Sequence, residues 1–133
     1  MQDRLVAIRD FAARYTAAWC SQDAASVAAF YAPDGSLTIN DDEPAVGRRA
    51  ITEQSHSFMA AFPDLRVVMD DVIVKGDLVE YHWTLTGTNT ARGGTGKPVR
   101  IHGFELWEFG HDGLIRSSRG SFDSGEYRRQ LAL

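Results

Sequence analysis

The sequence predicts an α+β fold in which helices pack on one face of an antiparallel sheet. Apolar residues recur at steps of three and four up to Phe62, as in helices, and at every second position from Leu65 onward, as in strands. Because the two periods occupy separate stretches of the chain, they favour an α+β arrangement over alternating βα units. A strongly curved sheet of this size forms a cone. We therefore expect three N-terminal helices on the concave face of a cone-shaped sheet and a short C-terminal helix.

The first predicted helix covers about residues 3–20. One of its faces carries the apolar residues Leu5, Ile8, Ala12, Tyr15 and Trp19, so Tyr15 and Trp19 face inward together. A second, short helix is predicted from Asp23, a good N-cap, to about Tyr31, where the turn-forming letters APDG follow.

A brief strand, SLTIN, and the loop DDEPAVG precede the third predicted helix. Ile51, Phe58 and Phe62 fall on one side of this helix. The helix is expected to stop at Phe62, because Pro63 disfavours a helical conformation in the residue before it.

The rest of the chain is predicted to form long strands and one last helix. The segments LRVVMDDVIV and LVEYHWTLTGT alternate in polarity on either side of the turn KGD, which indicates a hairpin. In the second of these strands, one face carries Val79, Tyr81, Trp83 and Leu85. The glycine-rich segment NTARGGTGKP is predicted to be a hairpin loop, and the turn GHDG separates two further strands. Asp123 or Ser124 is expected to cap a closing helix that runs to about Leu131.

The stretch GFELWEF places one carboxylate on the more apolar face of its strand. Alternation puts Glu105 on the same side as Gly103, Trp107 and Phe109. Either this glutamate is solvated on an edge strand, or it points into a cavity. The first alternative is favoured by the rarity of acidic side chains that are fully buried without a partner. The second would make Glu105 a candidate for function.

Length and composition restrict the classes of protein that the chain can belong to. With 133 residues and 44% hydrophobic content, residues 1–133 suit one globular domain. The net charge of −4 comes from interspersed acids and bases without a basic stripe, which argues against a nucleic-acid partner. No segment has the length and apolar character of a membrane span or a signal peptide, so a soluble cytoplasmic protein is expected.

The chain resembles the SnoaL-like branch of the nuclear-transport-factor-like superfamily. The letters RYTAAW, YAPDGSLT, FPDLRV, GTGKPVRIHGFEL and DGLI carry this resemblance in their order along nearly the whole chain. The branch includes polyketide cyclases, limonene epoxide hydrolases and ketosteroid isomerases. These motifs are specific for the fold and only weakly specific for a reaction, because the fold hosts enzymes, binding modules and assembly domains.

The resemblance implies a catalytic pair and a set of cavity walls. Tyr15 matches the tyrosine with which the isomerases donate a hydrogen bond to a substrate oxygen, and Glu105 matches a pocket aspartate of the isomerases and epoxide hydrolases. Glu105 and Tyr15 are thus the expected catalytic residues, with a glutamate pKa raised by burial. The expected substrate-binding residues share inward-facing positions: Trp19, Phe58, Phe62, Tyr81, Trp83, Trp107, Ser118 and Phe122.

Two positions depart from the pattern that the resemblance implies. The isomerases' catalytic base falls on Ile39, with Asn40 and Asp41 beside it, and an acid of many cyclases and hydrolases falls on Gly120. Asp123 could stand in for the second acid, but its helix-capping role explains its presence. A steroid-type double-bond shift therefore lacks its proton carrier.

Three classes of function stay open. The first is a cyclase or isomerase acting on a small apolar, oxygenated molecule, and the second is a protein that binds such a molecule without turnover. The third, a scaffold without a ligand, is disfavoured because an unpaired buried acid costs stability. No cofactor or metal is expected: no histidine pair has metal spacing, and GGTGKP lacks the Ser or Thr of a phosphate loop. A homodimer is expected through the outer sheet face, which carries Phe104 and Leu106.

Overall fold

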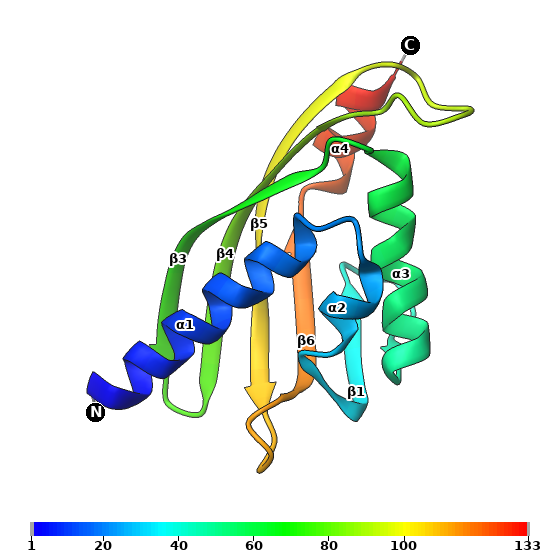
Figure 1. The fold of residues 1–133 in the computed structure, drawn as a ribbon. Coiled ribbons are helices and arrows are strands. Elements are labelled where there is room, and N and C mark those ends of the chain that lie inside the picture. Colours follow the sequence, from blue (N-terminus) through cyan, green and yellow to red (C-terminus); the bar gives the residue numbers. More distant parts are fainter. Residues whose placement is uncertain (1, 133) are drawn as a thin grey trace.

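The computed structural model describes residues 2–132 and confirms the α+β class (Figure 1). The helices and strands follow one another in this order: α1 (Gln2–Trp19), α2 (Ala24–Ala28), β1 (Tyr31–Ile39), β2 (Ala45–Val46), α3 (Arg48–Ala61), β3 (Arg66–Lys75), β4 (Leu78–Thr88), β5 (Pro98–Phe109), β6 (Ile115–Phe122) and α4 (Ser124–Leu131).

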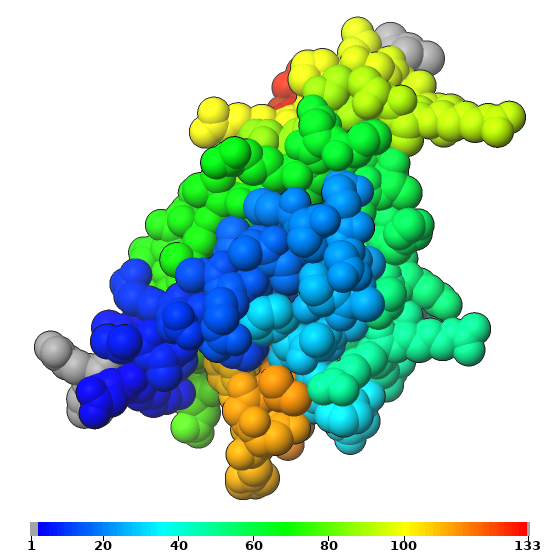
Figure 2. Space-filling view, in the orientation of Figure 1, coloured from blue at the N-terminus to red at the C-terminus, as the bar shows by residue number. Residues whose placement is uncertain are grey.

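All six strands form one curved sheet in the order β2-β1-β6-β5-β4-β3. Neighbouring strands are antiparallel except β1 and β6, which run parallel, so the sheet is mixed where a wholly antiparallel sheet was expected. The long connection from β1 to β6, which includes α3 and three strands, makes this parallel pairing possible. Figure 1 shows α1 crossing β3, β4 and β5 on the face that α2 and α3 also cover. In Figure 2 the atoms of α1 and α2 hide most of that face of the sheet.

Strand β1 differs from the sequence prediction in a way that shapes the site. Helix α2 ends at Ala28, and the letters APDG lie inside β1 instead of forming a turn after a helix. The pairing of β1 with β6 shifts register between Tyr31 and Ser36, which is a bulge that absorbs the proline and glycine. A Cβ on Gly35 would lie 2.8 Å from the carbonyl oxygen of Ile115, so only glycine fits there. As a result Tyr31 belongs to the sheet and is fully buried.

Other predicted boundaries agree with the structure. Helix α3 ends at Ala61, with Phe62 as its C-cap next to Pro63. Asp123 caps α4 by accepting a hydrogen bond from the backbone N–H of Glu126 at 3.0 Å. Within residues 2–132, no helix combines the length and the apolar character needed to cross a membrane.

Candidate active site

Glu105 lies near the middle of the sheet, on the face that the helices cover. In the antiparallel ladders it pairs with Tyr81 of β4 and with Gly120 of β6. Only 7% of Glu105 is exposed, so the alternative of a solvated glutamate on an edge strand is excluded. The alternation of the strand therefore predicts the direction of this side chain correctly.

One oxygen of the Glu105 carboxylate receives nearly all of its hydrogen bonds. Oε1 accepts from Ser118 Oγ at 2.7 Å, and from Tyr15 Oη and Trp107 Nε1 at 2.9 Å each. Tyr31 Oη lies 3.4 Å from Oε1 and 2.9 Å from Tyr15 Oη. Among the described residues, Oε2 has only the longer contact of 3.2 Å with Tyr15 Oη. The network thus holds one carboxylate oxygen and leaves the other with room for a further partner.

Burial and hydrogen bonding act on this carboxylate in opposite directions. Desolvation raises the pKa of Glu105 above the usual value of a glutamate, and the donors Trp107, Ser118, Tyr15 and Tyr31 offset part of that rise. Among residues 2–132, no Lys, Arg or His forms an ion pair with Glu105. Burial, followed by the nearby carboxylate, raises the pKa of Tyr15 and of Tyr31 well above that of a free tyrosine. Both phenols therefore keep their protons and act as donors near neutral pH.

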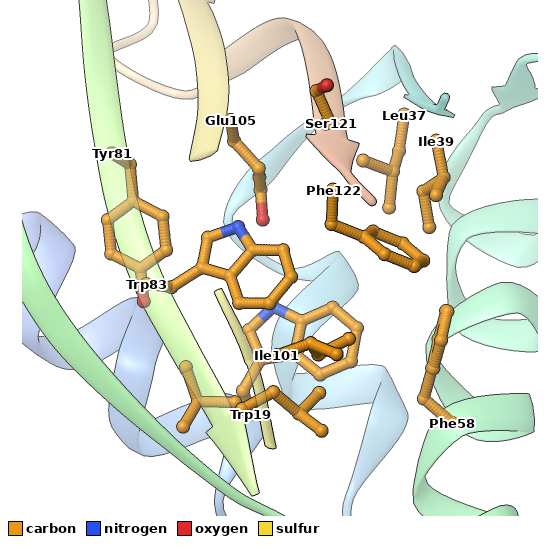
Figure 3. A pocket seen from close by; sticks show the side chains of 13 residues that line it. Trp19, Leu37, Ile39, Phe58, Tyr81, Trp83, Ile101, Glu105, Ser121 and Phe122 are labelled. Carbon is orange, nitrogen blue, oxygen red and sulfur yellow. The ribbon is translucent and has the colours of Figure 1, made fainter. Parts of the chain in front are cut away.

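Glu105 reaches the wall of a small pocket between the sheet and the helices (Figure 3). The cavity has a volume of about 50 Å³. The residues that line it are mainly apolar: Trp19, Leu37, Ile39, Phe58, Val67, Tyr81, Trp83, Leu85, Ile101, Glu105, Gly120, Ser121 and Phe122. Such a space holds roughly four water molecules, whereas pockets for drug-sized ligands measure about 300–1,000 Å³. A ligand larger than a few heavy atoms therefore requires the partly buried rings of Phe58 and Phe122 to move.

The structure separates the predicted site residues around Glu105 into two groups and places Phe62 in neither. Five of the expected substrate-binding residues line the cavity: Trp19, Phe58, Tyr81, Trp83 and Phe122. Tyr15, Trp107 and Ser118 lie outside its lining and donate to Glu105. Tyr15 thus donates to the carboxylate in this structure, and a bond from Tyr15 to a substrate oxygen stays a prediction. Phe62 packs against Tyr127 and over Gly87, where an added Cβ would lie 2.9 Å from Phe62 Cβ and 3.1 Å from the ring.

Sequence reasoning missed Tyr31 and several lining residues. Tyr31 was expected at the end of a helix, and only its place in β1 brings its hydroxyl to the Glu105 network. Leu37, Val67 and Ile101 follow the same inward alternation as the predicted walls, so their periodicity could have identified them as lining residues. Ser121 contacts the cavity near the end of β6, where alternation gives no such signal.

The two positions at which the resemblance implies a second acid, Ile39 and Gly120, carry no carboxylate. Ile39 and Gly120 line the cavity directly. Asn40 Oδ1 accepts from the backbone N–H of Phe122 at 2.9 Å, so this side chain links β1 to β6. Asp123 is exposed and caps α4. Within the part of the chain that the structure describes, Glu105 is the one carboxylate in the pocket lining, and no three His, Cys, Asp or Glu side chains are grouped to hold a metal ion.

Comparisons with known proteins agree with this architecture. A family described as "SnoaL-like domain" matches residues 12–118. A search among proteins with curated functions finds no match. Among solved structures, a protein with a ketosteroid isomerase-like fold from Catenulispora acidiphila DSM 44928, in complex with trimethylamine, has a TM-score of 0.81 at 18% identity, with 92% of each chain covered.

Two further solved structures show the same fold. A suggested SnoaL-like polyketide cyclase from Jannaschia sp. CCS1 has a TM-score of 0.74 at 19% identity, with 92% of each chain covered. A phenazine biosynthesis-related protein from Pseudomonas aeruginosa has a TM-score of 0.74 at 17% identity and covers 95% of this chain and 83% of its own. At these identities the likeness extends to the fold and not to a reaction.

Proposed function

The chain belongs to the SnoaL-like domain family, and from the geometry around Glu105 we propose that it is an enzyme of the cyclase or isomerase kind. Its reaction moves a proton on the carbon next to a carbonyl group of a small, largely apolar substrate. The observation that carries this proposal is the asymmetry of the Glu105 carboxylate. Oε1 is held by three short hydrogen bonds, while Oε2 has one longer contact and the side chain lines the cavity.

This arrangement suits a general base. A carboxylate is most effective in proton transfer when its pKa lies near the working pH, and burial moves the pKa of Glu105 in that direction. The donors on Oε1 fix the orientation of the group, so that Oε2 is the oxygen that meets the substrate. After taking the proton, the same oxygen can return it to a different carbon, as an isomerisation requires. Tyr15 is a positioning residue in this scheme, because it contacts the carboxylate and lies outside the cavity lining.

The size of the cavity supports a small ligand. About 50 Å³ accommodates only a few heavy atoms without rearrangement. The relative from Catenulispora acidiphila holds trimethylamine, which is a molecule of that size. A steroid or an aromatic polyketide would need a much larger opening between α3 and β6.

A second candidate function is binding without turnover. The observation that favours it is the apolar character of Ile39 and Gly120, which leaves a single carboxylate in the pocket. In that case Glu105 accepts a hydrogen bond from the ligand and moves no proton.

Deuterium exchange separates these two functions without knowledge of the natural substrate. Cyclopentanone in D₂O gains deuterium next to its carbonyl when a base removes the α-proton, and proton NMR follows the loss of signal. We expect the wild-type protein to accelerate this exchange, and Glu105→Gln to remove the acceleration. Glu43→Gln, which changes an exposed acid, is the matched control and should keep the wild-type rate. Equal rates for wild type and Glu105→Gln would exclude the enzyme and leave the binding protein.

The partners expected from the sequence extend this proposal. Phe104 and Leu106 lie on the outer face of the sheet and are partly buried in the single chain. A homodimer through that face stays a prediction that light scattering can test. The cytoplasmic location and the absence of a nucleic-acid partner also stay predictions from the sequence.

A further inference from the structure

The indole N–H of Trp83 is a buried donor that finds no acceptor in the part of the chain that the structure describes. Trp83 lines the cavity, and its Nε1 has no hydrogen-bond acceptor within the described chain. Nearly all buried donors in folded proteins are paired, so an unpaired one at a pocket wall calls for an explanation. The indole of Trp107, by comparison, donates to Glu105 at 2.9 Å.

The fold places Trp83 and Glu105 on the same wall of the cavity. Trp83 of β4 pairs with Gly103 of β5, two residues before Glu105 and on the same face. A Cβ on Gly103 would lie 2.9 Å from Cζ2 of Trp83, so the missing side chain lets the indole lie across β5. Figure 3 shows the ring nitrogen of Trp83 turned toward the carboxylate of Glu105. A donor and a carboxylate thus approach the same part of the cavity from neighbouring strands.

We propose that Trp83 donates its indole N–H to the carbonyl oxygen of the substrate and is thus a second catalytic residue beside Glu105. This inference rests on the proposed function and adds to it the group that binds the carbonyl oxygen. When Oε2 of Glu105 takes the α-proton, the C–H bond breaks and its electron pair forms a C=C bond, while the π electrons of C=O move onto oxygen. The growing negative charge strengthens the bond from Trp83, which lowers the barrier. Return of the proton to carbon restores the carbonyl group.

Two probes of matched shape test the donor directly. Cyclopentanone and methylenecyclopentane differ in one group, C=O against C=CH₂, so only the ketone can accept from an indole N–H. The protein is labelled with ¹⁵N at its tryptophan indoles, and the Trp83 signal is assigned from its absence in Trp83→Phe. Trp19→Phe is the matched control, because it also removes an indole from the cavity wall but leaves the unpaired N–H in place.

The expected result is a selective response to the ketone. Cyclopentanone should move the Trp83 indole proton downfield, and methylenecyclopentane should not. Trp83→Phe should reduce the ratio of the affinities for the ketone and the alkene about tenfold. Trp19→Phe should weaken the binding of both probes to the same extent. If Trp83→Phe does not fold, benzothienylalanine at position 83 keeps the ring shape and replaces N–H with sulfur.

Other outcomes overturn the inference and stay separable from the proposed function. An equal response to both probes, or a ketone preference that survives loss of the N–H, would show that a water molecule or nothing satisfies Trp83. If deuterium exchange still depends on Glu105 in that case, the proposed catalytic function is supported and Trp83 takes no part in it. If the ketone preference depends on Trp83 but exchange is absent, the carbonyl site stands and the catalytic proposal fails.

Discussion

Ser118→Ala provides a sharp test of the Glu105 network. Ser118 is fully buried, and its hydroxyl donates to Oε1 at 2.7 Å, the shortest bond that the carboxylate receives. A hydrogen bond to a charged group stabilises a fold by about 1.5–3 kcal/mol, and one between neutral groups by about 0.5–1.5 kcal/mol. The free energy of unfolding should therefore fall by about 1 kcal/mol at about pH 4, where Glu105 is largely protonated, and by about 2 kcal/mol or more at about pH 9.

Urea unfolding at the two pH values measures this difference. Ser55→Ala is the matched control, because Ser55 is equally buried but its hydroxyl has no hydrogen-bond partner among residues 2–132. Removal of the Ser55 hydroxyl should change the free energy of unfolding little, and by the same amount at both pH values. An equal loss of stability in Ser118→Ala at both pH values would contradict this expectation, since the bond would then not respond to ionisation of Glu105.

Three other substitutions give related expectations. The folded protein holds the Glu105 proton to higher pH than the unfolded chain does, because burial raises the pKa of this side chain. Wild type should therefore lose stability relative to Glu105→Gln as the pH rises from about 4.5 through the raised pKa, by up to about 1.4 kcal/mol per pH unit. Urea unfolding across this pH range measures the difference in stability, and a difference that stays constant would contradict the expectation. In Gly120→Ala the new Cβ would lie 3.6 Å from Thr38 O and 3.7 Å from Glu105 Cγ. This variant should keep its stability within about 1 kcal/mol but bind cyclopentanone more weakly in an NMR titration, and unchanged binding would place the ligand elsewhere. Asp123→Ala should lower the free energy of unfolding by about 1 kcal/mol without changing deuterium exchange; slower exchange would give Asp123 a role beyond the cap of α4.

The sequence predicts most of the fold because local patterns and packing agree. Alternation in β4 identifies the inward face that the structure shows. Helical spacing in α1 does so for Ile8, Ala12, Tyr15 and Trp19, but Leu5, which was expected on the same face, is 36% exposed. Pro63 marks the end of α3 for a steric reason that tertiary contacts do not change. Strand β1 is the exception. Proline and glycine signal a turn and a strand bulge alike, and the contact of Gly35 with Ile115 that decides between them joins segments far apart in the chain.

The candidate site is only partly predictable. Alternation gives the direction of Glu105, but it does not give the partner of Tyr15, because that bond depends on how α1 crosses the sheet. The volume of the cavity follows from the rotamers of large rings such as Phe58 and Phe122, which a pattern of letters does not specify. The position of the Trp83 indole, and with it the unpaired N–H, depends on the absence of a side chain at Gly103, which lies on the neighbouring strand β5.

A carbon-13 NMR titration of the Glu105 carboxyl group measures the property on which the proposed base depends, namely its pKa. The signal can be assigned from its absence in Glu105→Gln, and its chemical shift reports the protonation of this one side chain. Burial that outweighs the donors on Oε1 predicts a pKa above the ordinary glutamate value of 4.5. A titration at or below that value would show that the hydrogen bonds dominate, and Glu105 would then be too weak a base for the proposed reaction.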